Sequence, residues 1–200
     1  MPIITKTGIL LLSGGESSRM GQPKQLLDID GIPLIQHMVD VAISADLGPV
    51  VVVTGAYAEQ ITPLLRGVEI LYNANWNQGM ATSIRSGVEF MDTYHAEIDG
   101  LFILVCDQPY LKPVHLHSLW SVQQKHNFLA VASGYNNQYG TPVLFTKSLY
   151  PDLMSLKGDT GARQFLKTIE ERIGSVSFEE GTFDLDTMGD YEEYKRRGSC

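Results

Sequence analysis

The sequence predicts an α/β fold with three layers, α/β/α, in which helices cover both faces of a mostly parallel sheet. Two observations lead to this prediction. Short, continuously apolar runs recur along the chain, and segments with helical periodicity separate them. Continuous apolar runs are typical of strands buried on both faces, and alternation of strand and helix gives right-handed βαβ units. No internal repeat or linker divides the 200 residues, so we expect one domain, 1–200.

The expected strands begin with GILLLS (8–13) and PVVVVTG (49–55), a valine-rich run that ends at a glycine. Two further runs, VEILYN and GLFILVCD, repeat the pattern, and FLAVAS and PVLF are weaker versions of it. These four runs cover residues 68–73, 100–107, 128–133 and 142–145.

Four segments carry apolar residues at helical spacing. In residues 32–45 these residues form one stripe, and Pro33 suits the first turn of a helix. The other segments are 80–91, 114–126 and 160–173. In the last of them, we expect Asp159 or Thr160 to cap a helix that runs from Ala162.

Composition excludes several classes of protein. The net charge of -8 disfavours a general nucleic-acid binder, which needs a basic face. The two cysteines, Cys106 and Cys200, provide neither a disulfide framework nor a metal-ligand spacing. Neither a signal peptide nor an apolar run of roughly 18 residues is recognised. We therefore expect a cytoplasmic protein that binds neither nucleic acid nor a membrane.

The segment LLSGGESSRMGQPKQL (11–26) places three glycines beside two cations, Arg19 and Lys24, directly after the first strand. Neither a Walker loop nor a dinucleotide-binding fingerprint fits this spacing. One interpretation is a loop whose backbone N–H groups point inward at an anion, with the two cations beside it. The other is a plain strand-to-helix connection with cations on the surface, and the spacing alone leaves both open.

The stretch LSGGESSRMGQPK (12–24) resembles the pattern L-A-x-G-x-S-x-R-M-G-x-P-K of the molybdenum-cofactor nucleotidyltransferases, with Ser13 in place of alanine. Further segments resemble that family at 73–87 (NANWNQGMATSIRSG), 106–109 (CDQP) and 158–163 (GDTGAR). The resemblance implies a Rossmann-like sheet of the nucleotide-diphospho-sugar transferase type.

The resemblance also implies a nucleotide site. Arg19 would meet the β- and γ-phosphates and Lys24 the α-phosphate, so that Lys24, Arg19 and Asp107 are the implied catalytic residues. Asn73 is expected either to contact the nucleotide or to satisfy a turn. The nucleotide-binding residues implied are Leu12, Ser13, Gly14, Gly15, Arg19, Lys24, Asn73, Gly79 and Ser83.

Asp107 directly follows an apolar run, so its carboxylate is expected at the carboxyl edge of the sheet, beside the phosphates. A carboxylate there needs a cation between it and the phosphates, and Mg²⁺ is the usual one. The alternative is that Asp107 caps the helix that follows it.

A second carboxylate is expected from the segment FDLDTMGDYEEY (183–194). Asp184 and Asp186 are predicted to alternate in a short strand while Leu185 faces the other way. The segment resembles the ending D-x-D-T-P-E-D of the family, which implies that Asp186 is a metal ligand with Asp107. Here Met188 and Gly189 replace the Pro-Glu pair, and Asp190 is predicted to cap a helix.

The acceptor site is expected from two segments. Gly140 and Pro142 lie before a late strand and would line the acceptor pocket, with a turn as the alternative. Asp159 and Arg163 lie where a helix N-terminus would attract the acceptor phosphate, and plain helix capping is an equal alternative.

Together with these residues, the resemblance implies a Mg²⁺-dependent nucleotidyltransferase that moves a nucleotidyl group, CMP from CTP, to the phosphate of a molybdopterin-type acceptor and releases pyrophosphate. A molybdoenzyme or chaperone is a possible partner. The Gly14-Gly15 pair leaves GTP open as the nucleotide, and a sugar phosphate remains open as the acceptor. The alternative from a different class is a protein that binds a nucleotide or pterin without turnover.

Overall fold

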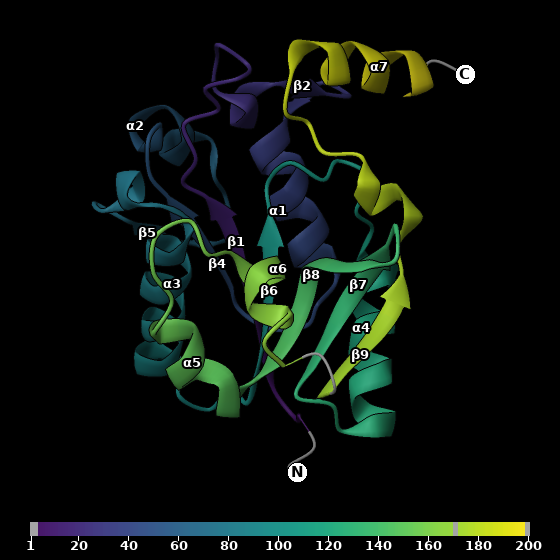
Figure 1. The fold of residues 1–200 in the computed structure, drawn as a ribbon. Coiled ribbons are helices and arrows are strands. Elements are labelled where there is room, and N and C mark those ends of the chain that lie inside the picture. Colours follow the sequence, from purple (N-terminus) through teal and green to yellow (C-terminus); the bar gives the residue numbers. More distant parts are fainter. Residues whose placement is uncertain (1–3, 170–171, 199–200) are drawn as a thin grey trace.

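A computed structural model describes residues 4–169 and 172–198 of the chain (Figure 1). Seven strands form one mixed sheet in the order β5-β4-β1-β6-β8-β7-β9, and β2 and β3 form a separate small ribbon. The strands are β1 (Thr7–Ser13), β2 (Asp28–Ile29), β3 (Ile32–Pro33), β4 (Val50–Thr54), β5 (Glu69–Tyr72), β6 (Gly100–Val105), β7 (Ala130–Tyr135), β8 (Gln138–Thr146) and β9 (Ile173–Ser177).

The sheet is mostly parallel, as the sequence predicts. Strands β5, β4, β1 and β6 are parallel neighbours, and β7 pairs in parallel with β9. Only β8 pairs antiparallel, with β6 on one side and β7 on the other. All six strands expected from the apolar runs are present, and the two weakest, at 128–133 and 142–145, belong to the long hairpin β7–β8.

Two apolar cores lie on opposite faces of the sheet. Side chains alternate along β1, so Ile9 and Leu11 pack into one core and Leu10 and Leu12 into the other. Helices α1 and α4, with the C-terminal helix α7, supply the first core, and α3, α5 and α6 supply the second (Figure 1). The helices are α1 (Leu34–Ser44), α2 (Ala58–Ile61), α3 (Met80–Tyr94), α4 (Pro113–His126), α5 (Tyr150–Met154), α6 (Ala162–Leu166) and α7 (Met188–Gly198).

Two of the predicted helices differ from the structure. The first begins at Leu34 rather than residue 32, because Ile32 and Pro33 pair with β2. The helix predicted over 160–173 does begin at Ala162 but ends at Leu166, and the chain then turns toward β9; residues 170–171 of this prediction lie outside the described residues. The expected side-chain cap from residue 159 or 160 is wrong, since Gly161 is the N-cap residue.

The predicted strand over Asp184–Asp186 is also wrong. This segment pairs with no strand of the sheet; it crosses the carboxyl edge and leads into α7. Leu185 does face inward, and it is fully buried. Cys106 is buried as a free thiol, and Cys200 lies outside the described residues. Within 4–169 and 172–198, none of the helices has the length and apolar character needed to cross a bilayer.

Candidate active site

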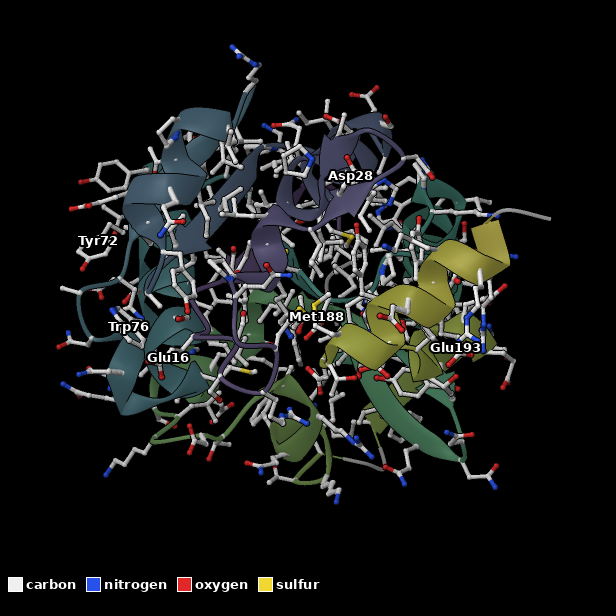
Figure 2. The ribbon with its side chains drawn as sticks, turned by 90° about the horizontal axis from the view of Figure 1, so that it is seen from above. Glu16, Asp28, Tyr72, Trp76, Met188 and Glu193 are labelled. Atoms are coloured by element: carbon white, nitrogen blue, oxygen red, sulfur yellow. The ribbon has the colours of Figure 1, made fainter. Side chains whose placement is uncertain are left out.

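The loops at the carboxyl edge of the sheet are seen from above in Figure 2, where Glu16 of the glycine-rich loop lies near Trp76 of the turn before α3. A cavity of about 360 Å³, here called the loop cavity, lies between the glycine-rich loop after β1, the turn before α3 and the end of β6. Its lining includes Leu12, Ser13, Gly14, Gly15, Lys24, Gly79, Ser83 and Asp107. Eight residues expected at the nucleotide or metal therefore surround one cavity.

The glycine-rich loop is held in shape by one buried glutamine. The Nε2 atom of Gln25 donates hydrogen bonds to the carbonyl oxygens of Ser13, at 3.2 Å, and Gly15, at 3.0 Å. Its Oε1 atom accepts a hydrogen bond from the hydroxyl of Ser17, which in turn accepts one from the backbone N–H of Lys24. Sequence reasoning missed Gln25; the available signal was a polar residue among the apolar residues that follow Lys24.

Close backbone contact explains the glycine at position 55, which packs on Gly14 of the glycine-rich loop. A Cβ atom on Gly55 would lie 2.6 Å from the carbonyl oxygen of Gly14, so the turn after β4 packs directly on the loop. At Gly15 a Cβ atom would meet no other atom within 4 Å, because that residue faces the open cavity. The close approach between the two loops therefore requires glycine at position 55, whereas a Cβ at Gly14 would meet the Ser83 hydroxyl oxygen at 3.1 Å and Gly15 leaves room for a ligand.

A cluster of opposite charges lies at the loop cavity, which Lys24 and Asp107 of this cluster line. Lys24 Nζ lies 2.6 Å from Asp107 Oδ2 and 3.1 Å from Asp186 Oδ1, and Arg19 Nη2 lies 2.9 Å from Asp186 Oδ2. The Lys24 side chain is 15% exposed. Burial acts to lower the pKa of Lys24, but the two carboxylates outweigh it and raise this pKa above its usual range, so the ammonium stays charged.

The carboxylates of this cluster fit a divalent cation. Asp107 and Asp186 both reach the same ammonium nitrogen, and Oδ1 of Asp107 is buried without a hydrogen-bond partner among the described residues. In the part of the chain that the structure describes, no group of three or more His, Cys, Asp or Glu side chains is arranged to hold a metal. A cation here would take its remaining ligands from phosphate and water, which is how Mg²⁺ is commonly bound.

A third carboxylate lies near the pair. Although the Asp184 side chain is open to solvent on one side, the surrounding protein and then the like charges of Asp107 and Asp186 raise the pKa of Asp184 to about 7.

The alternative that Asp107 caps the next helix is wrong, because α4 begins at Pro113 after Lys112.

The turn before α3 supplies another wall of the loop cavity. Gly79 and Ser83 line the cavity, as does Trp76. Asn73 is buried behind them: its Nδ2 donates to the hydroxyls of Thr82 and Ser83, and its Oδ1 accepts from a backbone N–H in the turn. Asn73 thus has the turn-forming role expected as one of its two alternatives.

A second cavity of about 280 Å³, here called the bridge cavity, continues from the first. Asp159 and Arg163 line it, together with Tyr135 and Thr141. Gly140, in contrast, is buried beneath the Tyr135 phenol, and Pro142 is buried with its carbonyl oxygen bonded to Ser133. Of the four residues expected at the acceptor, two line the bridge cavity and two lie behind its wall.

The C-terminal segment closes over the glycine-rich loop. Thr187 and Asp190 exchange hydrogen bonds at the start of α7, a capping-box arrangement that matches the predicted cap. Gln22 contacts Met188 across 166 residues of sequence, and the Tyr191 hydroxyl donates to the carbonyl oxygen of Asp28. These contacts fix the position of Asp186 beside Arg19 and Lys24.

Known proteins are similar to this chain over most of its length. A family model described as "MobA-like NTP transferase domain" matches residues 9–173. The purine catabolism protein PucB of Bacillus subtilis is 29% identical over 194 residues, which cover 92% of each chain. The molybdenum cofactor cytidylyltransferase of Escherichia coli is 24% identical over 191 residues, covering 94% of this chain and 95% of that one.

Solved structures share the fold. The crystal structure of Rv0371c from Mycobacterium tuberculosis superposes with a TM-score of 0.82 at 22% identity and covers 96% of this chain and 98% of that one. A second structure of Rv0371c is a complex with manganese, with a TM-score of 0.78 at 20% identity over 94% of this chain and 97% of that one. At these identities the likeness shows the fold.

Proposed function

Because the chain belongs to the MobA-like NTP transferase family and is therefore a nucleotidyltransferase, we propose that it transfers CMP from CTP to the phosphate of a molybdopterin-type acceptor and releases pyrophosphate. The observation that carries the proposal is the cluster of Lys24, Asp107 and Asp186, of which Lys24 and Asp107 line the loop cavity. A cation and two carboxylates beside a glycine-rich loop suit phosphoryl chemistry, in which positioning and charge neutralisation supply most of the rate.

In this proposal the triphosphate lies in the loop cavity. The backbone N–H groups around Gly14 and Gly15 meet the phosphates, Arg19 meets the β- and γ-phosphates, and Lys24 meets the α-phosphate. Gly79 and Ser83 contact the base or ribose. The Arg19 side chain is 72% exposed and, among the residues that the structure describes, its ion pair is with Asp186, a carboxylate that phosphate oxygens can replace.

The acceptor phosphate lies in the bridge cavity, on the other side of Asp107. One of its oxygens attacks the α-phosphorus, the bond to the bridging oxygen breaks, and pyrophosphate leaves. A phosphate monoester is already an anion near neutral pH, so the step needs no general base. Arg163 and Asp159 orient the acceptor, and Lys24 neutralises charge on the α-phosphate as it grows.

Asp107 and Asp186 would hold Mg²⁺, which supplies neutralisation of phosphate charge when bound. The unpartnered Oδ1 of Asp107 and the second carboxylate beside it favour this assignment. The manganese complex of the structurally similar Rv0371c is consistent with a divalent ion in this fold.

The base and the acceptor have named alternatives. CTP is favoured by the similarity to a cytidylyltransferase over nearly the whole chain, whereas the Gly14-Gly15 pair is the feature that favours GTP. A sugar phosphate is the alternative acceptor. A protein that binds a nucleotide or pterin without turnover needs no buried lysine at the α-phosphate, so the position of Lys24 disfavours it.

Two measurements test the proposal. In a thermal-shift panel of nucleoside triphosphates with and without Mg²⁺, CTP at about 100 times its Kd should stabilise the protein by roughly 2.7 kcal/mol, and by more than GTP. Pyrophosphate release should then require CTP, Mg²⁺ and a molybdopterin-type acceptor together. A larger shift with GTP would move the proposal to guanylyl transfer, and binding without pyrophosphate release would favour the non-catalytic alternative.

A further inference from the structure

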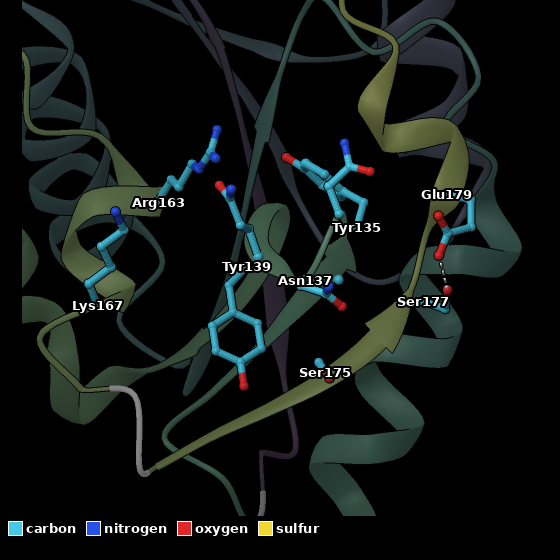
Figure 3. A pocket seen from close by; sticks show the side chains of 11 residues that line it. Tyr135, Asn137, Tyr139, Arg163, Lys167, Ser175, Ser177 and Glu179 are labelled. Atoms are coloured by element: carbon cyan, nitrogen blue, oxygen red, sulfur yellow. Dashed lines mark hydrogen bonds between the residues drawn. The ribbon is translucent and has the colours of Figure 1, made fainter.

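The turn that carries Asp107 has different surroundings on the two faces of the sheet. On the face that α6 covers, Asp107 borders the bridge cavity, and a larger cavity of about 720 Å³ shares Tyr135 and Arg163 with it (Figure 3). On the other face, Leu111 at the end of the turn packs in the same apolar core as helix α1. Protein packing thus supports the turn from the α1 side.

A histidine of α1 forms a hydrogen bond with this turn. The Nε2 atom of His37 lies 2.9 Å from the carbonyl oxygen of Pro109, which follows Asp107 by two residues. Because a carbonyl oxygen only accepts hydrogen bonds, Nε2 is the ring nitrogen that carries the hydrogen. His37 is half-buried and Pro109 is buried. Loss of the donor would therefore leave a shielded carbonyl group that bulk water does not readily satisfy.

The same helix is bonded to the segment that carries Lys24. The backbone N–H of Leu34 donates to the carbonyl oxygen of Leu27 at 2.8 Å, and the N–H of Leu27 donates to the carbonyl oxygen of Lys24 at 3.1 Å. Leu34 and His37 are three residues apart in α1, so they lie on the same side of its first turn. One turn of helix therefore contacts the backbone that supports Lys24 and the backbone that supports Asp107.

The distance between these two charged side chains depends on how the Asp107 turn is held. Lys24 Nζ lies 2.6 Å from Asp107 Oδ2. The carbonyl oxygen of Asp107 accepts a hydrogen bond, at 2.9 Å, from the N–H of Leu185, which directly precedes Asp186. His37 holds the turn from a second element, two residues farther along. Since a small misplacement of a reacting or charge-neutralising group costs much of the rate, removing one of these two anchors should be felt at the carboxylate.

We propose that His37 is a positioning residue for nucleotidyl transfer: its Nε2–H holds the Pro109 carbonyl group and thereby keeps the Asp107 carboxylate in place beside Lys24 and the divalent cation. The inference rests on the proposed function and adds the residue that fixes its charged cluster from behind. His37 lines neither the loop cavity nor the bridge cavity, so it acts through the turn and not on a ligand. Removing a group that supports a metal ligand commonly weakens metal binding or activity by about 10–100-fold.

The experiment measures Mn²⁺ binding to the full chain without nucleotide, from the loss of the free-ion EPR signal. His37→Leu removes the hydrogen-bond donor, and His37→Gln keeps an amide N–H at about the reach of Nε2. The control is His117→Leu, which changes an exposed histidine of α4. His37→Leu should weaken Mn²⁺ binding about tenfold, whereas His37→Gln and His117→Leu should stay within about twofold of the wild type.

Kinetics distinguish positioning from a general loss of structure. In CTP-dependent pyrophosphate release, His37→Leu should lower kcat about tenfold and leave KM for CTP unchanged, since the glycine-rich loop is held by Gln25. His37→Gln should restore kcat. A role in stability alone would lower the urea midpoint of His37→Leu and leave the Mn²⁺ affinity and kcat of the folded protein as in the wild type.

Four results would overturn the inference: wild-type Mn²⁺ affinity in His37→Leu, an equal loss in His117→Leu, no recovery in His37→Gln, or no saturable Mn²⁺ binding to the wild-type protein. The Mn²⁺ measurement needs neither CTP nor an acceptor, so it is separate from the test of the proposed function. His37-dependent Mn²⁺ binding without CTP turnover would refute the function alone. Turnover of CTP with kcat and Mn²⁺ affinity unchanged in His37→Leu would refute the inference alone.

Discussion

Replacing Gln25 by leucine should loosen the glycine-rich loop and lower the stability of the fold. The side chain is 1% exposed, and its amide satisfies two backbone carbonyl groups, those of Ser13 and Gly15, and accepts from the Ser17 hydroxyl. Leucine has a similar size but offers no hydrogen bond. The Ser13 carbonyl oxygen would lose its buried hydrogen-bond donor, while the Gly15 carbonyl oxygen and the Ser17 hydroxyl can form hydrogen bonds with water instead.

An orphaned buried polar group costs about 1–3 kcal/mol and a partly solvated one less. We therefore expect Gln25→Leu to lower the free energy of unfolding by about 2–4 kcal/mol. Urea unfolding followed by circular dichroism measures it, and CTP affinity should fall as well because the loop is no longer held open. The matched control is Gln60→Leu, an exposed glutamine in α2, which should stay within about 0.5 kcal/mol. Equal stability of Gln25→Leu and the wild type would refute the reasoning.

Three further perturbations follow from the same contacts. Lys24→Ala should reduce kcat for CTP-dependent pyrophosphate release by about 10²–10³, the usual loss for one preorganised donor, and an unchanged kcat would remove Lys24 from the transfer step. Gly55→Ala should destabilise by about 1–3 kcal/mol, because the new Cβ meets backbone atoms at 2.6 and 2.8 Å, whereas Gly15→Ala should be close to neutral in the same urea titration. Burial lowers the pKa of His115 to about 4, against a usual 6.5, so the unfolded chain binds more protons between these values. The contribution of His115 to stability is present above about pH 6.5 and is lost as the pH falls. The free energy of unfolding should therefore drop by about 2 kcal/mol between pH 7.5 and 5. The drop should be smaller in His115→Asn and unchanged in the exposed control His117→Asn.

The parts of the structure that the sequence predicts well are those that local pattern determines. Strand β1 is buried along its whole length, and its central residues are apolar on both faces of the sheet. The glycines and cations of the site follow it within one loop. In helix α3 the apolar residues recur at helical spacing, so the sequence alone identifies the face that is buried. In these cases the residues that decide the conformation are near neighbours in the chain.

The prediction failed where distant contacts decide the conformation. Asp184 and Asp186 alternate as in a strand, but the segment pairs with no strand of the sheet, and ion pairs from Asp186 to Lys24 and Arg19 hold it in position. Gln25 takes its importance from carbonyl groups that face it only after the loop has folded. The spacing of residues along the chain reveals neither these ion pairs nor the carbonyl groups that Gln25 contacts.

The acceptor side shows the same limit. Gly140 attracts attention as a glycine before a strand, yet it serves to make room for the Tyr135 ring, and Tyr135 is the residue that lines the cavities. Lys167 lay inside a segment expected to continue as a helix, and its place beside the hairpin became visible only when α6 ended at Leu166. Residues that line a cavity from different elements are recognised only once those elements are assembled.

The most direct test of the central claim follows the α-phosphorus of CTP. Wild-type protein, Mg²⁺, CTP labelled at the α-phosphate and a molybdopterin-type acceptor are mixed, and labelled acceptor and free pyrophosphate are measured together. We predict one pyrophosphate for each labelled acceptor, with both products lost in Asp107→Asn and Lys24→Ala. Pyrophosphate formed without labelled acceptor, or equal transfer by the two variants, would contradict the assignment of Lys24 and Asp107 as the centre of nucleotidyl transfer.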